Sequence, residues 1–126
     1  MKHDPYPVFD IHNEWDTKEN ILRTWYSSKN DMTYFCLYKY VDDPFTLYLS
    51  NLYVDEDCRG LGIGNRILNF AASYAKINGA KRIRLWAEKD SMPYKWYKRH
   101  LYFDMAKEYE GKPNNVWMQF DIPPEV

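Results

Sequence analysis

The chain has 126 residues, is 45% hydrophobic and 28% charged, and carries a formal net charge of −1. These values predict one globular domain over residues 1–126 with a sizeable core, and a near-neutral chain is not expected to have nucleic acid as its partner. No apolar run approaches a membrane span, and no apolar export signal follows Met1, so we expect a cytoplasmic protein without a membrane partner. Cys36 and Cys58 then read as free thiols.

The first 28 residues give the weakest structural signal. Residues 1–12 predict an irregular lead-in to a short edge strand, because prolines are tolerated at the edge of a sheet. Residues 14–26 favour a helix, although residues 23–28 could equally form a strand. The helical interpretation depends on the spacing of Trp15, Ile21, Leu22, Trp25 and Tyr26.

The middle of the chain predicts a hairpin followed by a strand–helix–strand unit. Thr33–Tyr40 and Phe45–Val54 read as antiparallel strands over a turn at 41–44. Residues 63–78 form the clearest helix, which Asn78 and Gly79 end. Its expected buried face is Ile63, Ile67, Phe70, Ala71, Tyr74 and Ala75. The next strand, 82–87, should then pair in parallel with 45–54.

The last third predicts a second helix and a closing hairpin. The helix covers about Met92–His100, with Asp90 or Ser91 as its cap. Strands at 103–109 and 116–122 flank a turn at 110–115. Alternation in the second strand predicts a buried face of Val116, Met118, Phe120 and Ile122. The fold class is α/β, with a mixed, mostly antiparallel twisted sheet and flanking helices.

Charge is unevenly distributed along the chain. Residues 1–57 hold 5 Lys and Arg against 11 Asp and Glu, residues 58–100 hold 10 against 2, and residues 101–126 hold 2 against 5. The basic segment starts at a loop containing Gly60, Gly62 and Gly64. An anionic ligand is therefore expected near this loop and a cationic one beside the acidic part.

The glycine loop lies between a predicted strand and a predicted helix, an arrangement that points backbone N–H groups at a phosphate. A P-loop would need Lys and Ser or Thr after the glycines, whereas Asn65 and Arg66 follow Gly64. The spacing also fails to match the dinucleotide fingerprint.

The loop resembles the acetyl-CoA-binding motif of the GCN5-related N-acetyltransferase (GNAT) family, Gln/Arg-x-x-Gly-x-Gly/Ala. Here it stands as Arg59-Gly60-Leu61-Gly62-Ile63-Gly64, after Leu52-Tyr53-Val54-Asp55. A second block, from Asp90 to Tyr97, is similar to the family's Asn-x-x-Ala-x-x-aromatic-Tyr. The resemblance runs from about residue 45 to 122 and implies the GNAT acyl-CoA N-acyltransferase fold.

The resemblance implies an N-acetyltransferase that moves the acetyl group of acetyl-CoA directly to a primary amine, without a metal. Tyr97 is implied as the general acid at the leaving thiolate, and Glu88 is our first choice of base, ahead of Asp55 or Glu56. Lys95, Lys98 or Arg99 would meet the adenosine phosphate. The implied cofactor-binding residues are Leu52, Val54, Arg59, Gly60, Leu61, Gly62, Ile63, Gly64, Asn65, Arg66, Asp90 and Tyr97.

Three departures from the family pattern bear on function. Asp90 replaces the usual Asn, and Pro93 replaces the usual Ala. The region before the loop is short, so the acceptor groove is either open or completed by a partner chain, as in a homodimer. The alternative function is a non-catalytic acyl-CoA-binding sensor or interaction module. As a cationic acceptor we consider a polyamine, a lysine side chain, a protein N-terminus or an amino-sugar.

Overall fold

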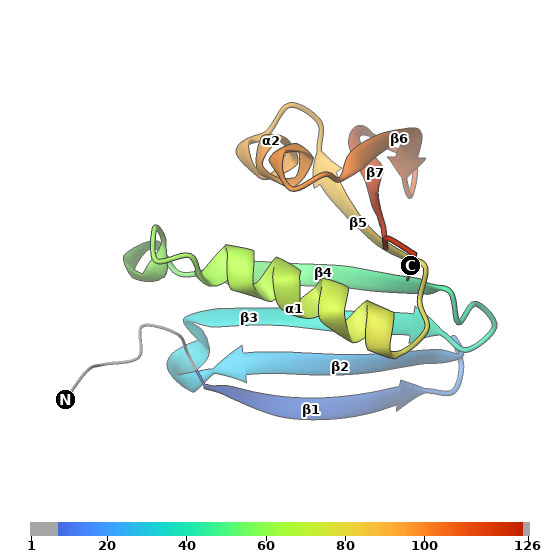
Figure 1. Cartoon of the computed structure of the whole chain (residues 1–126), viewed down its shortest axis with the longest axis horizontal. Helices are drawn as coiled ribbons and strands as arrows, with labels where there is room; N and C mark the ends of the chain where they lie inside the picture. Colours follow the sequence, from blue (N-terminus) through green and yellow to red (C-terminus); the bar gives the residue numbers. More distant parts are fainter. Residues whose placement is uncertain (1–7, 125–126) are drawn as a thin grey trace.

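The computed structural model describes residues 8–124. One seven-stranded sheet runs through this part of the chain in the order β1-β2-β3-β4-β5-β7-β6 (Figure 1). The strands are β1 (Phe9–Asp16), β2 (Ile21–Ser28), β3 (Thr33–Tyr40), β4 (Thr46–Val54), β5 (Arg82–Glu88), β6 (Phe103–Tyr109) and β7 (Lys112–Asp121). The α-helices are α1 (Ile63–Ile77) and α2 (Met92–Arg99), and short 3-10 turns cover Lys29–Asp31 and Glu56–Cys58. This is the mixed, mostly antiparallel sheet that the sequence predicts, with β4–β5 as its parallel pair.

The helix expected over residues 14–26 is wrong, because these residues form the hairpin of β1 and β2. The Asp16 carboxylate accepts hydrogen bonds from the amides of Lys18 and Glu19, and Asn20 takes a positive φ of 59° to close the turn. β2 is paired on both sides, with β1 and with β3. Hydrogen bonding to a strand on each side stabilises β2 as a strand, although its apolar residues have a helical spacing. Its aromatic and β-branched side chains also suit the pleated surface of a sheet. Of the lead-in and edge strand predicted over residues 1–12, residues 1–7 lie outside the described residues, and from Phe9 the chain forms β1, which is an edge strand of the sheet.

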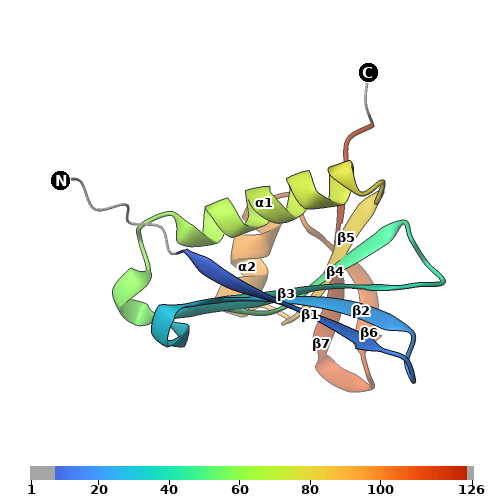
Figure 2. The ribbon, with the colours of Figure 1, turned by 90° about the horizontal axis from the view of Figure 1, so that it is seen from below.

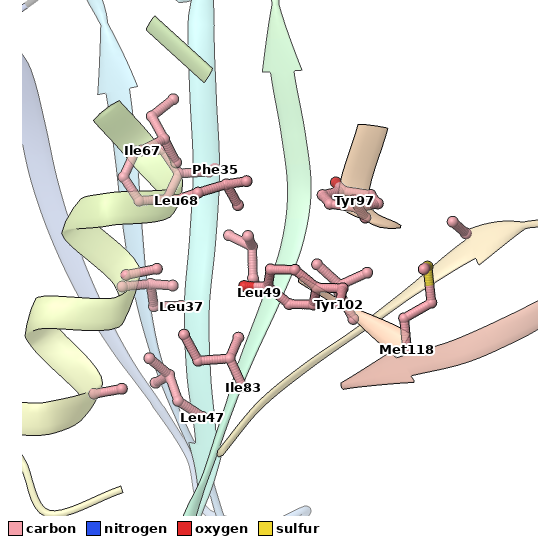
Figure 3. Close-up of a cluster of buried hydrophobic side chains, with 14 of the residues drawn as sticks. Phe35, Leu37, Leu47, Leu49, Ile67, Leu68, Ile83, Tyr97, Tyr102 and Met118 are labelled. Carbon is pink, nitrogen blue, oxygen red and sulfur yellow. The ribbon is translucent and has the colours of Figure 1, made fainter. Parts of the chain in front are cut away.

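Helix α1 packs over β3 and β4 and ends at Ile77, with Asn78 as its C-cap (Figure 1). Its buried residues are Ile63, Ile67, Leu68, Ala71 and Ala75. The expected face is correct for four of its six residues. Tyr74 is only partly buried, and Phe70 is 42% exposed, while Leu68 is buried instead. Figure 3 shows Ile67 and Leu68 pointing at Phe35 and Leu37 of the sheet.

The closing hairpin has a tighter turn than the sequence predicts. Glu110 and Gly111, both with positive φ, make the turn, and β7 already begins at Lys112. Two central residues of positive φ are typical of the primed turns that match the twist of a hairpin. Val116 and Met118 are buried as expected, while Phe120 and Ile122, which follows the end of β7, are only partly buried.

The two α-helices lie on the same face of the sheet, since one core joins them (Figure 2). On β5 and β7 the residues of this core alternate with residues of the other face, which no helix covers in residues 8–124. β4 and β5 pair over only three residues each, 46–48 with 82–84. β4 continues beside β3 to Val54, whereas β5 continues beside β7, so the two strands diverge (Figure 1).

Candidate functional site

The glycine loop begins where β4 ends and passes directly into α1. The Asp55 carboxylate accepts hydrogen bonds from the Asp57 amide at 3.1 Å and from the Tyr53 hydroxyl at 3.1 Å, which fixes the start of the loop. Gly60 and Gly62 have φ values of +82° and +77°, which residues with a side chain rarely adopt. Gly62 is also the N-cap of α1.

The first turn of α1 presents amides to this loop. The amide of Arg66 donates to the carbonyl of Gly62 at 3.1 Å, so the intrahelical ladder begins there. Helix geometry leaves the amides at 63–65 without an intrahelical carbonyl. These donors and the positive end of the helix dipole make a site for an anion such as a pyrophosphate.

Gly64 is required for a reason that the sequence does not reveal. A Cβ at this position would lie 2.9 Å from Cζ2 and 3.1 Å from Cη2 of Trp96, which belongs to α2. Gly64 therefore lets the ring of α2 pack against the first turn of α1. This contact connects the glycine motif to the second motif, and each was identified separately from the sequence.

Arg59, Leu52 and Val54, three residues of the predicted cofactor site, lie at the end of β4 and at the start of the loop that follows it. The Nε of Arg59 donates to the carbonyl of Val54 at 2.9 Å, so this guanidinium is held against the end of β4. Leu52 and Val54 pack their side chains partly into the core, and they lie beyond Tyr48, where the pairing of β4 with β5 ends.

A β-bulge in β4 is the feature that sequence reasoning missed. Tyr34 pairs with Tyr53 but Cys36 pairs with Ser50, so Asn51 and Leu52 together oppose one residue of β3. Asn51 has a φ of 55°. A bulge turns backbone groups out of the ladder, and here it does so beside the opening between β4 and β5. An asparagine inside an apolar strand was the available signal, since Asn tolerates this conformation.

Helix α2 is capped by Ser91, whose hydroxyl accepts from the Tyr94 amide at 3.2 Å. Asp90 precedes the cap, is exposed, and has a φ of 65°. The Tyr94 hydroxyl donates to Asp104 of β6 at 3.0 Å, which ties α2 to the closing hairpin.

Tyr97 is buried on α2, on the helical face of the sheet, and only 8% of it is exposed. Figure 3 shows Tyr102 beside Leu49 of β4, with Met118 of β7 on the other side of Tyr102, and the Tyr97 ring lies 5.7 Å from the Tyr102 ring. Burial raises the pKa of the Tyr97 hydroxyl to about 12. The group is therefore a neutral phenol at physiological pH, able to donate a hydrogen bond.

Glu88 is the last residue of β5, where it pairs with Asn115, and its side chain is exposed. Because Ala87 belongs to the core, alternation places Glu88 on the helix-free face. The structure thus places the predicted acid and the predicted base on opposite faces of the sheet. Asp55, an alternative base, is engaged with Tyr53 and the loop.

The basic residues expected at the phosphate differ in their surroundings. Arg99 and His100 line a pocket of about 280 Å³ between α1 and α2, together with Asn69. Lys98 instead lies over the ring of Tyr94, with its Nζ 5.4 Å from the ring centroid. Arg99 therefore faces a pocket, whereas Lys98 is held over a ring.

Within residues 8–124, no cluster of three His, Cys, Asp or Glu side chains is arranged to hold a metal ion. No helix of this part is long and apolar enough to cross a bilayer. Cys36 and Cys58 are both free, and Cys36 is buried.

Comparison with known proteins adds one family and a set of similar folds. The family described as "Acetyltransferase (GNAT) family" matches residues 3–102 of this chain. This match starts and ends earlier in the chain than the motif resemblance, which runs from about residue 45 to 122. Nourseothricin acetyltransferase superposes with a TM-score of 0.62 at 15% identity, covering 82% of this chain and 66% of that one. Ard1 from Thermoplasma volcanium superposes with a TM-score of 0.66 at 18% identity, covering 81% of this chain and 71% of that one. An aminoglycoside 6'-N-acetyltransferase complexed with coenzyme A superposes with a TM-score of 0.64 at 15% identity, covering 86% of this chain and 77% of that one. This chain thus spans just under two thirds of nourseothricin acetyltransferase.

Proposed function

Because the chain belongs to the acetyltransferase (GNAT) family, we propose that it transfers the acetyl group of acetyl-CoA directly to a primary amine. The observation that carries this proposal is the divergence of β4 and β5 directly beside the amide-lined loop. An extended pantetheine arm fits alongside a strand edge without a partner, and a pyrophosphate fits the N-terminus of α1.

We assign the binding roles as follows. The backbone amides from Gly60 to Asn65 bind the pyrophosphate, and the backbone of Leu52 and Val54 pairs with the pantetheine arm. Arg59 and Arg66 add positive charge near the loop. Arg99 faces the pocket between the helices and is our choice for the adenosine phosphate.

The chemistry forms a bond from the amine nitrogen to the acetyl carbon and breaks the bond from that carbon to sulfur. Tyr97 acts at the sulfur. Burial raises the pKa of its phenol to about 12. Because burial keeps this phenol protonated, Tyr97 stabilises the leaving thiolate by donating a hydrogen bond. This refines the sequence-based assignment of a general acid.

The attacking amine must lose protons on the side away from Tyr97. Glu88 is exposed at the end of β5 on the helix-free face, and we propose that it takes these protons directly or through water. An acid partner on one face and a base on the other allow the amine and the thioester to approach from opposite sides of the sheet.

The test is release of free thiol from acetyl-CoA with a panel of primary amines. We expect Tyr97→Phe to lower kcat by about 100-fold, while acetyl-CoA still raises the melting temperature. The matched control is Tyr102→Phe, which removes the hydroxyl of a neighbouring buried tyrosine and should leave kcat nearly unchanged.

The alternative is a non-catalytic acyl-CoA-binding module. It predicts that acetyl-CoA stabilises the protein but that no amine in the panel releases thiol above the rate without protein. Failure of acetyl-CoA at about millimolar concentration to shift the melting temperature would reject both functions.

A further inference from the structure

A groove runs along the side of α1 and over the hairpin of β1 and β2, on the face of the sheet that carries both helices. Two hollows, of about 370 Å³ and 310 Å³, lie along it. One wall is a stripe that follows about three turns of α1. The stripe consists of Ile63, Ile67, Phe70 and Tyr74. We call this surface the hairpin groove.

The opposite rim of the hairpin groove is one row of β1. Its residues alternate onto the side of α1, two of them in each hollow. They are Phe9, Ile11, Asn13 and Trp15. Ile11 is 62% exposed and Trp15 is 56% exposed, and Phe70 on the facing wall is also open to solvent. Large apolar side chains that gather around a hollow, rather than lie scattered over a surface, indicate a binding site for another molecule.

The spacing of the helices indicates which kind of element fits the hairpin groove. Neighbouring helices pack about 8–10 Å apart and neighbouring strands lie about 4.8 Å apart, so adjacent helices are separated by about two strands. α1 packs over β3 and β4, and α2 packs against β5 and β6, which lie on either side of β7. The same step from α1 in the other direction leads to β1 and β2, over which residues 8–124 place no helix (Figure 1). A third helix therefore has the width that this position requires.

Both ends of the hairpin groove carry a cation. Arg66 lines the hollow beside the first turn of α1, and Lys39 lines the hollow at the other end. The other charged residues of the lining are Glu14 and Arg23, which form an ion pair with each other at 3.2 Å. The lining thus holds three cations and one carboxylate, and the remaining acids of β1 alternate onto the opposite face of the sheet. An apolar segment with acidic residues at both ends complements this surface.

We propose that the hairpin groove binds an amphipathic α-helix of a partner protein, which carries an apolar stripe and acidic residues at both ends of the stripe. The helix lies beside α1 and covers Ile11, Trp15 and Phe70. A strand paired to the edge of β1 would extend the sheet sideways and leave these side chains uncovered. A second copy of this chain does not supply the helix from residues 8–124, because α1 and α2 are both packed into the core. The proposal does not depend on the transferase function.

The test uses a synthetic peptide of about 18 residues, long enough to form a helix. It has leucines at i, i+4, i+7 and i+11, a glutamate three residues before and after this stripe, and alanine and glutamine elsewhere. Binding is followed by fluorescence anisotropy of a labelled peptide, and its helix content by circular dichroism. We expect the peptide to gain helix on binding, and to bind at least about tenfold more tightly than a peptide of the same composition in scrambled order.

Variants locate the binding. Ile11→Lys and Trp15→Lys should each weaken peptide binding about tenfold, because each places a charge against the apolar stripe. The matched control is Ile77→Lys, which changes an exposed apolar residue at the end of α1 outside the lining and should bind like the parent. Lys39→Glu should weaken binding a few-fold, and by less when glutamine replaces both glutamates of the peptide. Far-ultraviolet circular dichroism and melting temperature confirm that each variant is folded.

Equal affinity for the striped and scrambled peptides, no binding at about millimolar peptide, or parent-like binding by Ile11→Lys and Trp15→Lys would overturn the proposal. Binding without a gain of helix would also overturn it, because a strand at the edge of β1 would then be the occupant. Helical binding by a protein that releases no thiol would reject the transferase function and leave the hairpin groove standing. Thiol release without peptide binding would reject the groove alone.

Discussion

The contact between Gly64 and Trp96 gives the sharpest prediction. Gly64→Ala places a methyl group 2.9 Å from Cζ2 of Trp96, closer than carbon atoms normally approach. Overpacking of this kind costs about 1–3 kcal/mol. Alanine regains up to about 1 kcal/mol of helix propensity over glycine. We therefore expect Gly64→Ala to lower the free energy of unfolding by about 1 kcal/mol.

The same substitution should act differently when the ring is gone. In a Trp96→Leu background, the added methyl meets no ring and keeps its propensity gain, so Gly64→Ala should stabilise by about 0.5–1 kcal/mol. Urea unfolding of the four proteins of this double-mutant cycle then gives a coupling energy of about 1–3 kcal/mol. Acetyl-CoA affinity should fall in Gly64→Ala and recover in the double variant, because the first turn of α1 returns to its place.

Gly60→Ala is the control for this cycle. No atom lies within 4 Å of a Cβ at Gly60, but its φ of +82° strains any side chain. Its cost of about 1–2 kcal/mol should be the same with and without Trp96. If Gly64→Ala also has the same effect in both backgrounds, within about 0.5 kcal/mol, the packing argument is refuted.

Three further predictions concern α2 and its surroundings. Tyr94→Phe removes the hydrogen bond to Asp104 and should cost about 1–2 kcal/mol in urea unfolding; an unchanged midpoint would contradict a role for this bond. Asp90→Asn keeps a residue that tolerates positive φ and removes a negative charge, so acetyl-CoA should bind about 2–5-fold more tightly at low salt, a gain that must shrink at high salt. The raised pKa of Tyr97 stabilises the fold below pH 10, and this contribution is lost as pH rises toward 12, by up to about 1.4 kcal/mol per pH unit; Tyr97→Phe should flatten that slope.

Much of the region around the loop could be predicted because its signals are local. The positive φ of Gly60 and Gly62, the cap at Ser91 and the spacing of α1 are all encoded within a few residues of where they act. A glycine conformation or a cap is decided by neighbouring backbone atoms, so sequence alone determines it.

The hairpin of β1 and β2 could not be predicted in the same way. A strand is stabilised only by the strands beside it, and β2 gains its stability from β3, which follows in the chain, as well as from β1. The spacing of apolar residues in 14–26 matched a helix, but that spacing says nothing about available partners. Only the assembled sheet decides between the two structures.

The candidate site likewise combines features that depend on neighbouring residues with features that depend on residues far apart in the chain. The sequence by itself determined the amide-lined loop, the helix that follows it and the aromatic second motif. Tertiary structure decided that the ring of Trp96 packs where a Cβ of residue 64 would lie, and that Tyr97 and Glu88 lie on opposite faces of the sheet. It also decided that rings from five strands meet on the face that no helix covers in residues 8–124. These facts depend on distances between residues far apart in the chain, and such distances exist only once β4 and β5 have paired and diverged.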